Sequence, residues 1–179
     1  MVQAASMEHP HRLGLAIYEP DIAQNTGAML RTCACLGVEA SLIGPAGFNR
    51  FDPRFKRAAM DYVHAASMVD HIDWSAFEAW RRKARRRLVA LSTKASLPYC
   101  DFAFAPGDIL LVGRESAGLP DMVHRAADAR VVIPLRAGLR SLNVSVAAGM
   151  ALGEAMRQLA QTCGGVAISP EQGARPEAS

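Results

Sequence analysis

The sequence has few of the features that mark metal sites, disulfide scaffolds or hydrolases. It contains four cysteines, and the closest two, Cys33 and Cys35, lack the two-residue gap of a zinc or redox pair. None of the five histidines belongs to an HExxH motif, and no GxSxG elbow occurs. These absences argue against a metal site, a disulfide framework and a serine triad. Isolated cysteines also favour a reducing compartment.

Long apolar runs are missing as well. No stretch approaches the roughly 20 apolar residues of a membrane helix, and the first twelve residues contain no apolar core of a signal peptide. We therefore expect a cytoplasmic protein without a membrane segment. The net charge of +3 permits an anionic partner without requiring one.

The length of 179 residues fits one domain with its own core. We expect this domain at 13–163, after a flexible N-terminal extension (1–12) and before a disordered, polar and proline-containing tail (164–179).

Predicted strands and helices alternate along the domain. Short apolar runs predict strands at 13–18, 38–43, 65–69, 88–91, 109–112 and 130–133. Caps and periodicity predict helices at 26–36, 52–62, 74–86 and 143–161, with a short one after Pro120. Asn25 or Thr26 is expected to cap the first helix, Gly37 to end it, and Asp73 to cap the third.

This alternation predicts an α/β fold, in which a mostly parallel sheet carries helices on both faces. Ligands of such sheets bind where loops leave the carboxyl ends of the strands. The loops of interest are therefore 19–26, 92–96, 113–120 and 134–142.

Three of these loops contain residues suited to binding. Asn25-Thr26-Gly27 with Arg31 fits a phosphate at a helix N-terminus, or merely a capped helix with a surface arginine. Gly113, Glu115 and Gly118 fit close approach to a ligand, or only the start of a helix. The loop at 113–120 is not a Walker loop, because the lysine of that motif is missing. The loop with Arg136, Arg140, Ser141 and Asn143 suits an anion or a hydroxyl, although Ser141 and Asn143 could simply cap the last helix.

Two further features leave alternatives open. Gly149 and Gly153 lie four residues apart in the last predicted helix, which fits either tight packing within the chain or self-association. The run 81–87 has six cations in seven positions. Such a run is usually a solvated helix face, but it could also follow a nucleic-acid backbone.

Taken together, the three loops resemble the ordered motifs of the SpoU (TrmH-like) branch of the SPOUT RNA 2′-O-methyltransferases, over about residues 13–159. The matching segments are Asn25-Thr26-Gly27 with Arg31, Gly113-x-Glu115-x-x-Gly118-Leu119, and Ile133-Pro134 followed by Ser141-Leu142-Asn143-x-Ser145. Within that branch, the chain looks most like the small single-domain TrmL type. The segments that carry this likeness are Tyr18-Glu19-Pro20, Asp61-Tyr62 and Ser92-Thr93-Lys94.

The resemblance implies a fold and a reaction. The fold would contain a C-terminal deep trefoil knot that forms the cofactor pocket. The methyl donor would be S-adenosyl-L-methionine. The substrate would be tRNA, methylated on the ribose of the wobble cytidine or uridine at position 34, in leucine tRNAs for this type. The resemblance also implies a homodimer and no metal. Gly149 and Gly153 are candidates for the dimer contact.

The resemblance also assigns site residues. Cofactor contacts fall on Leu91, Gly113, Ile133, Ser141 and Leu142. Arg31 matches the catalytic arginine, which would bind the substrate phosphate and orient the 2′-hydroxyl, because an arginine is almost never deprotonated. The residues expected to shape the catalytic site with it are Asn25, Glu115, Ser141 and Asn143.

Two positions depart from the TrmL pattern. Arg114 stands where proline is frequent, and the segment 136–139 is unusual. Both concern the substrate side, so the alternatives are a methyltransferase with another tRNA or rRNA target and a non-catalytic RNA-binding module. An ordinary doubly wound nucleotide-binding enzyme would need a phosphate fingerprint, which is missing.

Overall fold

The computed structural model describes residues 12–49 and 67–162. The predicted helix at 52–62, residues 1–11 of the N-terminal extension, the tail and Asp61-Tyr62 lie outside the described residues. Four helices of the described part are labelled in the order of the chain: α1 (Ala23–Leu36), α3 (Trp74–Lys83), α4 (Asp121–Ala126) and α5 (Val144–Thr162).

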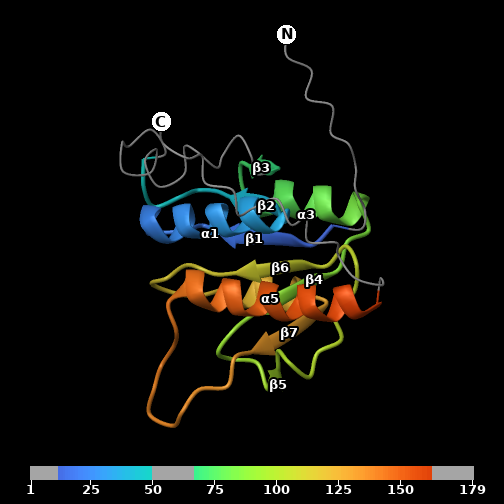
Figure 1. Cartoon of the computed structure of the whole chain (residues 1–179). Coiled ribbons are helices and arrows are strands. Elements are labelled where there is room, and N and C mark those ends of the chain that lie inside the picture. The colour runs from blue at the N-terminus through green and yellow to red at the C-terminus, as the bar shows by residue number, and fades with distance from the viewer. Residues whose placement is uncertain (1–11, 50–66, 163–179) are drawn as a thin grey trace, which may run out of the picture.

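A seven-stranded sheet forms the centre of the described structure (Figure 1). Its strands are β1 (Gly14–Tyr18), β2 (Glu39–Ile43), β3 (Met68–His71), β4 (Leu88–Leu91), β5 (Leu97–Pro98), β6 (Ile109–Val112) and β7 (Ala129–Val132). They are ordered β3-β2-β1-β6-β4-β7-β5, and every neighbouring pair is parallel. The predicted mostly parallel sheet is therefore confirmed.

The sheet is covered on both faces. Alternate residues of β1 point to opposite faces, so Leu15 and Ile17 join one core cluster while Ala16 and Tyr18 join the other. The first cluster contains residues of α1 and α5, which lie side by side on one face (Figure 1). The second contains Phe77 of α3 and Val123 of α4. Burial on both faces explains why these strands read as continuous apolar runs.

Most predicted elements occur, with corrections at their ends. Gly37 ends α1 in the left-handed conformation (φ +66°), and the Asp73 carboxylate accepts a hydrogen bond from the Ala76 amide at 2.8 Å, as predicted. The strand predicted at 65–69 is β3, which extends to His71. Strand β5 was not predicted, because two residues are too few to show a pattern.

The predicted start of α1 is wrong. The helix begins at Ala23 after Ile22, which offers no side-chain cap. Thr26 instead donates its hydroxyl to the Ile22 carbonyl at 3.2 Å, and Asn25 lies inside the first turn. These two side chains are of the capping type, but their polar groups are engaged elsewhere.

The basic run at 81–87 was interpreted either as a solvated helix face or as a nucleic-acid contact. Neither interpretation holds for three of its six cations, which are engaged in ion pairs within the chain. Arg81 is only 6% exposed and binds Glu78 and Asp128. Arg86, also 6% exposed, pairs with Glu39 and lies over the Trp80 ring. Arg87 pairs with Asp108 at 2.7 Å. These arginines connect the carboxyl end of α3 and the start of β4 to the amino ends of β2, β6 and β7. Helix α3 also ends at Lys83, before the predicted limit of 86.

None of the described helices is both long and apolar enough to cross a membrane.

Candidate active site

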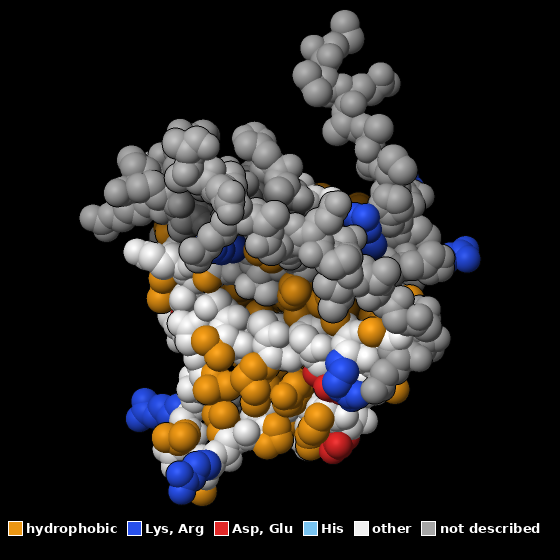
Figure 2. All heavy atoms as spheres, viewed as in Figure 1, with side chains coloured by type: hydrophobic (Ala, Val, Ile, Leu, Met, Phe, Trp, Pro, Cys, Tyr) orange, Lys and Arg blue, Asp and Glu red, His pale blue; other side chains and the backbone are white. Residues whose placement is uncertain are grey.

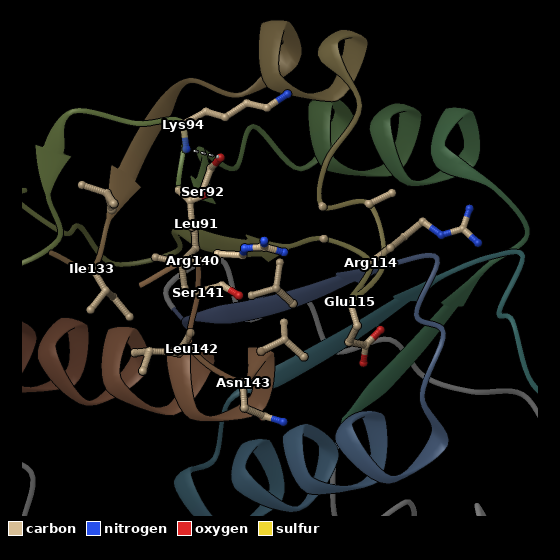
Figure 3. A pocket seen from close by; sticks show the side chains of 18 of the residues that line it. Leu91, Ser92, Lys94, Arg114, Glu115, Ile133, Arg140, Ser141, Leu142 and Asn143 are labelled. Carbon is tan, nitrogen blue, oxygen red and sulfur yellow. Dashed lines mark hydrogen bonds between the residues drawn. The ribbon is translucent and has the colours of Figure 1, made fainter. Parts of the chain in front are cut away.

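A cavity of about 570 Å³ opens at the carboxyl ends of β4, β6 and β7 (Figure 3). This is the edge at which parallel α/β sheets bind ligands. Three loops meet there: 92–94 after β4, 113–118 after β6, and 133–143 after β7. The first turns of α1 and α5 complete the wall with Ile22, Asn25, Val144 and Ala147.

The loop after β6 closes tightly on itself. Arg114 and Gly118 exchange backbone hydrogen bonds of 3.2 and 2.8 Å, and Gly118 adopts φ +68°. A Cβ atom on Gly113 would lie 2.5 Å from the carbonyl carbon of Gly118 and 2.7 Å from the Leu119 nitrogen. Because both are backbone atoms, no side-chain rotation could relieve the clash. The loop's own backbone therefore requires a glycine at position 113, and the ligand approach anticipated from the sequence is not needed to explain it.

A chain of polar side chains runs along one wall of the cavity. Glu115 accepts hydrogen bonds from the Asn25 side-chain amide (3.1 Å) and the Asp21 backbone amide (2.9 Å). Asn143 donates its side-chain amide to the Asn25 oxygen at 3.0 Å. The structure thus brings Asn25, Glu115 and Asn143, which are distant in sequence, into one hydrogen-bonded series.

Asn143 also caps α5. Its side-chain oxygen accepts from the Ser145 amide (2.9 Å), the Val146 amide (3.4 Å) and the Ser145 hydroxyl (2.6 Å). Capping and site formation were alternatives in the sequence, and the structure shows that this side chain does both. The orientation of α5 is thereby coupled to the polar wall of the cavity. Ser141 lies in the lining but does not cap the helix through any hydrogen bond of the described structure.

Arg114 is held by two carboxylates. Its guanidinium contacts Glu19 at 3.0 Å and Asp21 at 2.9 Å. Hydrogen bonds from Ser116 and Arg114 lower the pKa of Asp21, and the hydrogen bond to Asp21 raises the pKa of Arg114. These contacts fasten the loop after β6 to the loop after β1. The departure from the TrmL pattern at this position is thus an internal ion pair.

The opposite wall carries Ser92 and Lys94. The Ser92 hydroxyl accepts from the Lys94 amide at 3.1 Å and lies 3.5 Å from Nε2 of the buried His124. Burial lowers the pKa of His124, with further lowering by Lys94 and Arg130. The interior between the two walls is mainly apolar, and is formed by Leu91, Val112, Val132, Ile133, Leu135 and Ala147.

All of the predicted site residues except Arg31 line this cavity. Arg31 lies exposed on α1, two turns beyond Asn25, and is not among the lining residues. Ile22, Val144 and Ala147 were not expected in the site, because they carry no polar side chain that a motif could reveal. Arg140 was noted in its loop but was not assigned a role. Among residues 12–49 and 67–162, no three His, Cys, Asp or Glu side chains gather as metal ligands.

Comparison with known proteins places this geometry in a family. The SpoU rRNA Methylase family matches residues 12–153. A tRNA (cytidine(34)-2′-O)-methyltransferase of Beijerinckia indica is 63% identical over 145 residues, which cover 81% of this chain and 91% of that protein.

Two solved structures are similar as well. The first comes from work on structural insights into the 2-OH methylation of C/U34 on tRNA. It has a TM-score of 0.79 and 39% sequence identity, and the match covers 85% of this chain and 99% of that chain. The second is an AdoMet-bound rRNA methyltransferase of Sinorhizobium meliloti, with a TM-score of 0.77 and 30% sequence identity. The match covers 84% of this chain and 59% of that chain. The match over most of the chain, together with these relatives, shows that the chain belongs to the SpoU rRNA Methylase family.

Proposed function

We propose that this chain is a tRNA 2′-O-methyltransferase that acts on the ribose of nucleotide 34, a cytidine or uridine, with leucine tRNAs as the expected substrates. The observation that carries the proposal is that residues from all three motifs line one cavity at the carboxyl edge of the sheet, namely Asn25, Gly113 with Glu115, and Ile133 with Ser141. The 63% identity to a cytidine-34 enzyme supports the choice of nucleotide.

S-adenosyl-L-methionine is the proposed methyl donor, and the residues present fit it. The volume lies within the range of about 300–1,000 Å³ usual for small-molecule sites, and the lining combines apolar walls with a few polar groups. Leu91, Ile133 and Leu142 would pack on the adenosine, while Gly113 and Ser141 offer backbone and hydroxyl groups. When bound, this cofactor supplies a methyl group on a sulfonium leaving group.

The protein's own contribution is positioning. The reaction needs a ribose 2′-oxygen held in line with the methyl group at about 3 Å. The fixed series Glu115–Asn25–Asn143 provides hydrogen-bonding groups beside the cavity without a cost of rearrangement. We assign these three residues, with Ser141, to the placement of the target ribose.

Arg31 is proposed to bind the phosphate next to that ribose and so to orient its 2′-hydroxyl. A guanidinium suits this task because it stays charged and presents a planar fork of donors. Since Arg31 stands on α1 outside the cavity, the RNA must extend from the cavity to α1, or α1 of a second subunit must reach it.

A homodimer would provide that second surface. Ile22, Val146 and Met150 are 42%, 52% and 40% exposed, and hydrophobic side chains gather on the face that carries α5 (Figure 2). A Cβ atom on Gly149 or Gly153 would meet nothing within 4 Å, so tight packing within the chain does not explain these glycines. The open apolar face supports a helix-to-helix contact between subunits.

We also infer that the segment after β7 forms the deep trefoil knot of the SPOUT fold. The convergence of 92–94, 113–118 and 133–143 around one cavity supports this inference. Since tRNA is the proposed substrate, we place the enzyme in the cytoplasm.

The test uses labelled S-adenosyl-L-methionine and total RNA from a strain that lacks this gene, with tRNA and rRNA separated after the reaction. We expect label in a small set of tRNAs, and mapping should locate it at nucleotide 34. Label at another nucleotide would contradict the proposed target, and labelling of rRNA alone would assign the enzyme to another substrate. If no RNA is labelled, the methyltransferase proposal fails, and a non-catalytic RNA-binding module is the alternative that remains.

A further inference from the structure

Three cationic side chains line the cavity, and they differ in their ion-pair partners. Arg114 is neutralised by Glu19 and Asp21. Lys94 has its ammonium 3.7 Å from the Asp121 carboxylate, with both groups exposed. Arg140 has neither an ion pair nor a side-chain hydrogen bond within the part of the chain that the structure describes. Of the three, it is the cation that remains available for an outside anion.

The backbone holds Arg140 in place from both sides. On one side, the Leu139 amide donates to the Arg136 carbonyl at 3.2 Å, in a turn where Gly138 takes φ +89°. On the other side, Asn143 is fixed by Asn25 and by its cap on α5. The exposed Arg140 side chain therefore stands at the cavity between two anchored points (Figure 3).

We propose that Arg140 binds a backbone phosphate of the RNA at the mouth of the cavity, and so sets how the target nucleotide enters. This inference rests on the proposed function, because it takes RNA as the substrate. A guanidinium can fork onto two phosphate oxygens, and such charge-assisted pairs are the stronger hydrogen bonds. Arg114 cannot take this role without giving up its two carboxylates.

A phosphate is favoured over the carboxylate of the cofactor by location. The apolar side chains form the interior of the cavity, whereas Arg140 is exposed and shares its loop with the exposed Arg136. A phosphodiester backbone that passes over the mouth would meet both arginines on the solvent side.

The test measures tRNA binding by fluorescence anisotropy over a range of salt concentrations. Arg140→Ala should weaken binding about tenfold, as expected for one charge-assisted hydrogen-bonded contact. The slope of log Kd against log salt should fall by about 0.7 to 1, the share of one phosphate contact. Arg140→Lys should keep the slope but recover only part of the affinity, because an ammonium is a point charge.

Two controls make the result specific. Arg82→Ala removes an exposed arginine at the end of α3, before β4 and hence near the opposite edge of the sheet, and should leave tRNA binding unchanged. Calorimetry with S-adenosyl-L-methionine should give the wild-type affinity for Arg140→Ala. A wild-type salt slope in Arg140→Ala would overturn the proposal, as would a loss of cofactor affinity with normal tRNA binding.

The outcomes also separate this inference from the proposed function. If the wild type methylates nucleotide 34 and Arg140→Ala binds tRNA normally, only the inference fails. If the wild type methylates a different RNA, the target assignment fails, and the role of Arg140 is then decided by the same salt slopes on that RNA.

Discussion

At the scale of single residues, Glu115 is the side chain on which the polar wall depends. Both of its oxygens accept hydrogen bonds, one from Asn25 and one from the Asp21 amide. In Glu115→Gln, an amide NH₂ would face one of these donors. We expect kcat to fall at least tenfold and the free energy of unfolding to fall by about 1–3 kcal/mol, while the affinity for S-adenosyl-L-methionine is retained.

Steady-state kinetics, calorimetry and urea unfolding check this expectation. Asp101→Asn is the matched control, because it neutralises an exposed carboxylate outside the cavity lining. An unchanged kcat in Glu115→Gln would mean that the polar series does not position the substrate.

The residue scale also shows what the sequence could and could not reveal. The motif residues were predicted as a set because the three loops together resemble the SpoU motifs, whereas each loop by itself left its role open. The hydrogen-bond partners of these residues were not predictable. Asn25 and Thr26 looked like caps, but whether an asparagine caps its own helix or bonds to Glu115 depends on residues 90 positions away. Apolar lining residues such as Ala147 gave no signal at all.

At the scale of elements, the arginines between α3 and β4 stabilise the fold. Arg81 is buried between Glu78 and Asp128, whereas Arg82 pairs with Glu78 from an exposed position. Arg81→Ala should lower the free energy of unfolding by about 3 kcal/mol or more, since it removes a donor from the buried Glu78 carboxylate and from the buried Arg86 carbonyl. Arg82→Ala should lower it by less than about 1 kcal/mol. Equal losses in urea unfolding would contradict this assignment.

The misinterpretation of this basic run has a physical cause. Six cations in seven positions normally repel one another and face water. Here Asp128, Glu39 and Asp108 neutralise three of them, and these carboxylates lie 47, 47 and 21 residues away in sequence. The sheet topology brings the partners together, and local pattern contains no information on it.

Strand β3 and helix α3 contain a second buried polar group. His71 packs among Phe77 and Trp80, with Nε2 3.3 Å from the Ser41 hydroxyl. Burial lowers the pKa of His71 below its ordinary value of 6.5, against opposing effects of Asp70 and Glu39. The unfolded chain therefore binds a proton more readily than the folded one. Stability should fall as the pH drops below about 6.5, by at most about 1.4 kcal/mol per pH unit for this histidine.

Urea unfolding at pH 7.5 and at pH 5.5 measures this dependence. His71→Gln removes the titrating group and should reduce the difference between the two pH values, whatever its effect on stability itself. His124, whose pKa is also lowered, should account for part of what remains. A variant with the full wild-type difference would show that His71 is not responsible.

At the scale of the whole molecule, we expect a dimer through α5. Met150→Asp places a charge on the exposed apolar face and should convert the protein to a monomer, with methyl transfer reduced at least tenfold. Met122→Asp is the control, because Met122 is also exposed but belongs to α4, on the other face of the sheet. Analytical ultracentrifugation distinguishes the outcomes. A monomeric wild type, or a dimeric Met150→Asp, would contradict the contact.

The parallel sheet with helices on both faces was predictable from its apolar runs, since β1, β2, β4 and β6 are buried on both sides. The order of the strands was not, because β7 lies between β4 and β5 through contacts that no local pattern encodes. The proposed knot would depend on how the chain threads through itself, and only the family resemblance implied it.

Methylation of the 2′-oxygen of nucleotide 34 is tested most directly by replacing that single hydroxyl of the substrate. Anticodon stem-loops or tRNAs are prepared with a 2′-deoxyribose at nucleotide 34 or, as a control, at nucleotide 32, and are incubated with the enzyme and labelled S-adenosyl-L-methionine. We expect that the 34-deoxy RNA accepts no methyl group, while the 32-deoxy RNA is methylated like the unmodified one. Equal methylation of the 34-deoxy RNA would show that the 2′-oxygen of nucleotide 34 is not the acceptor.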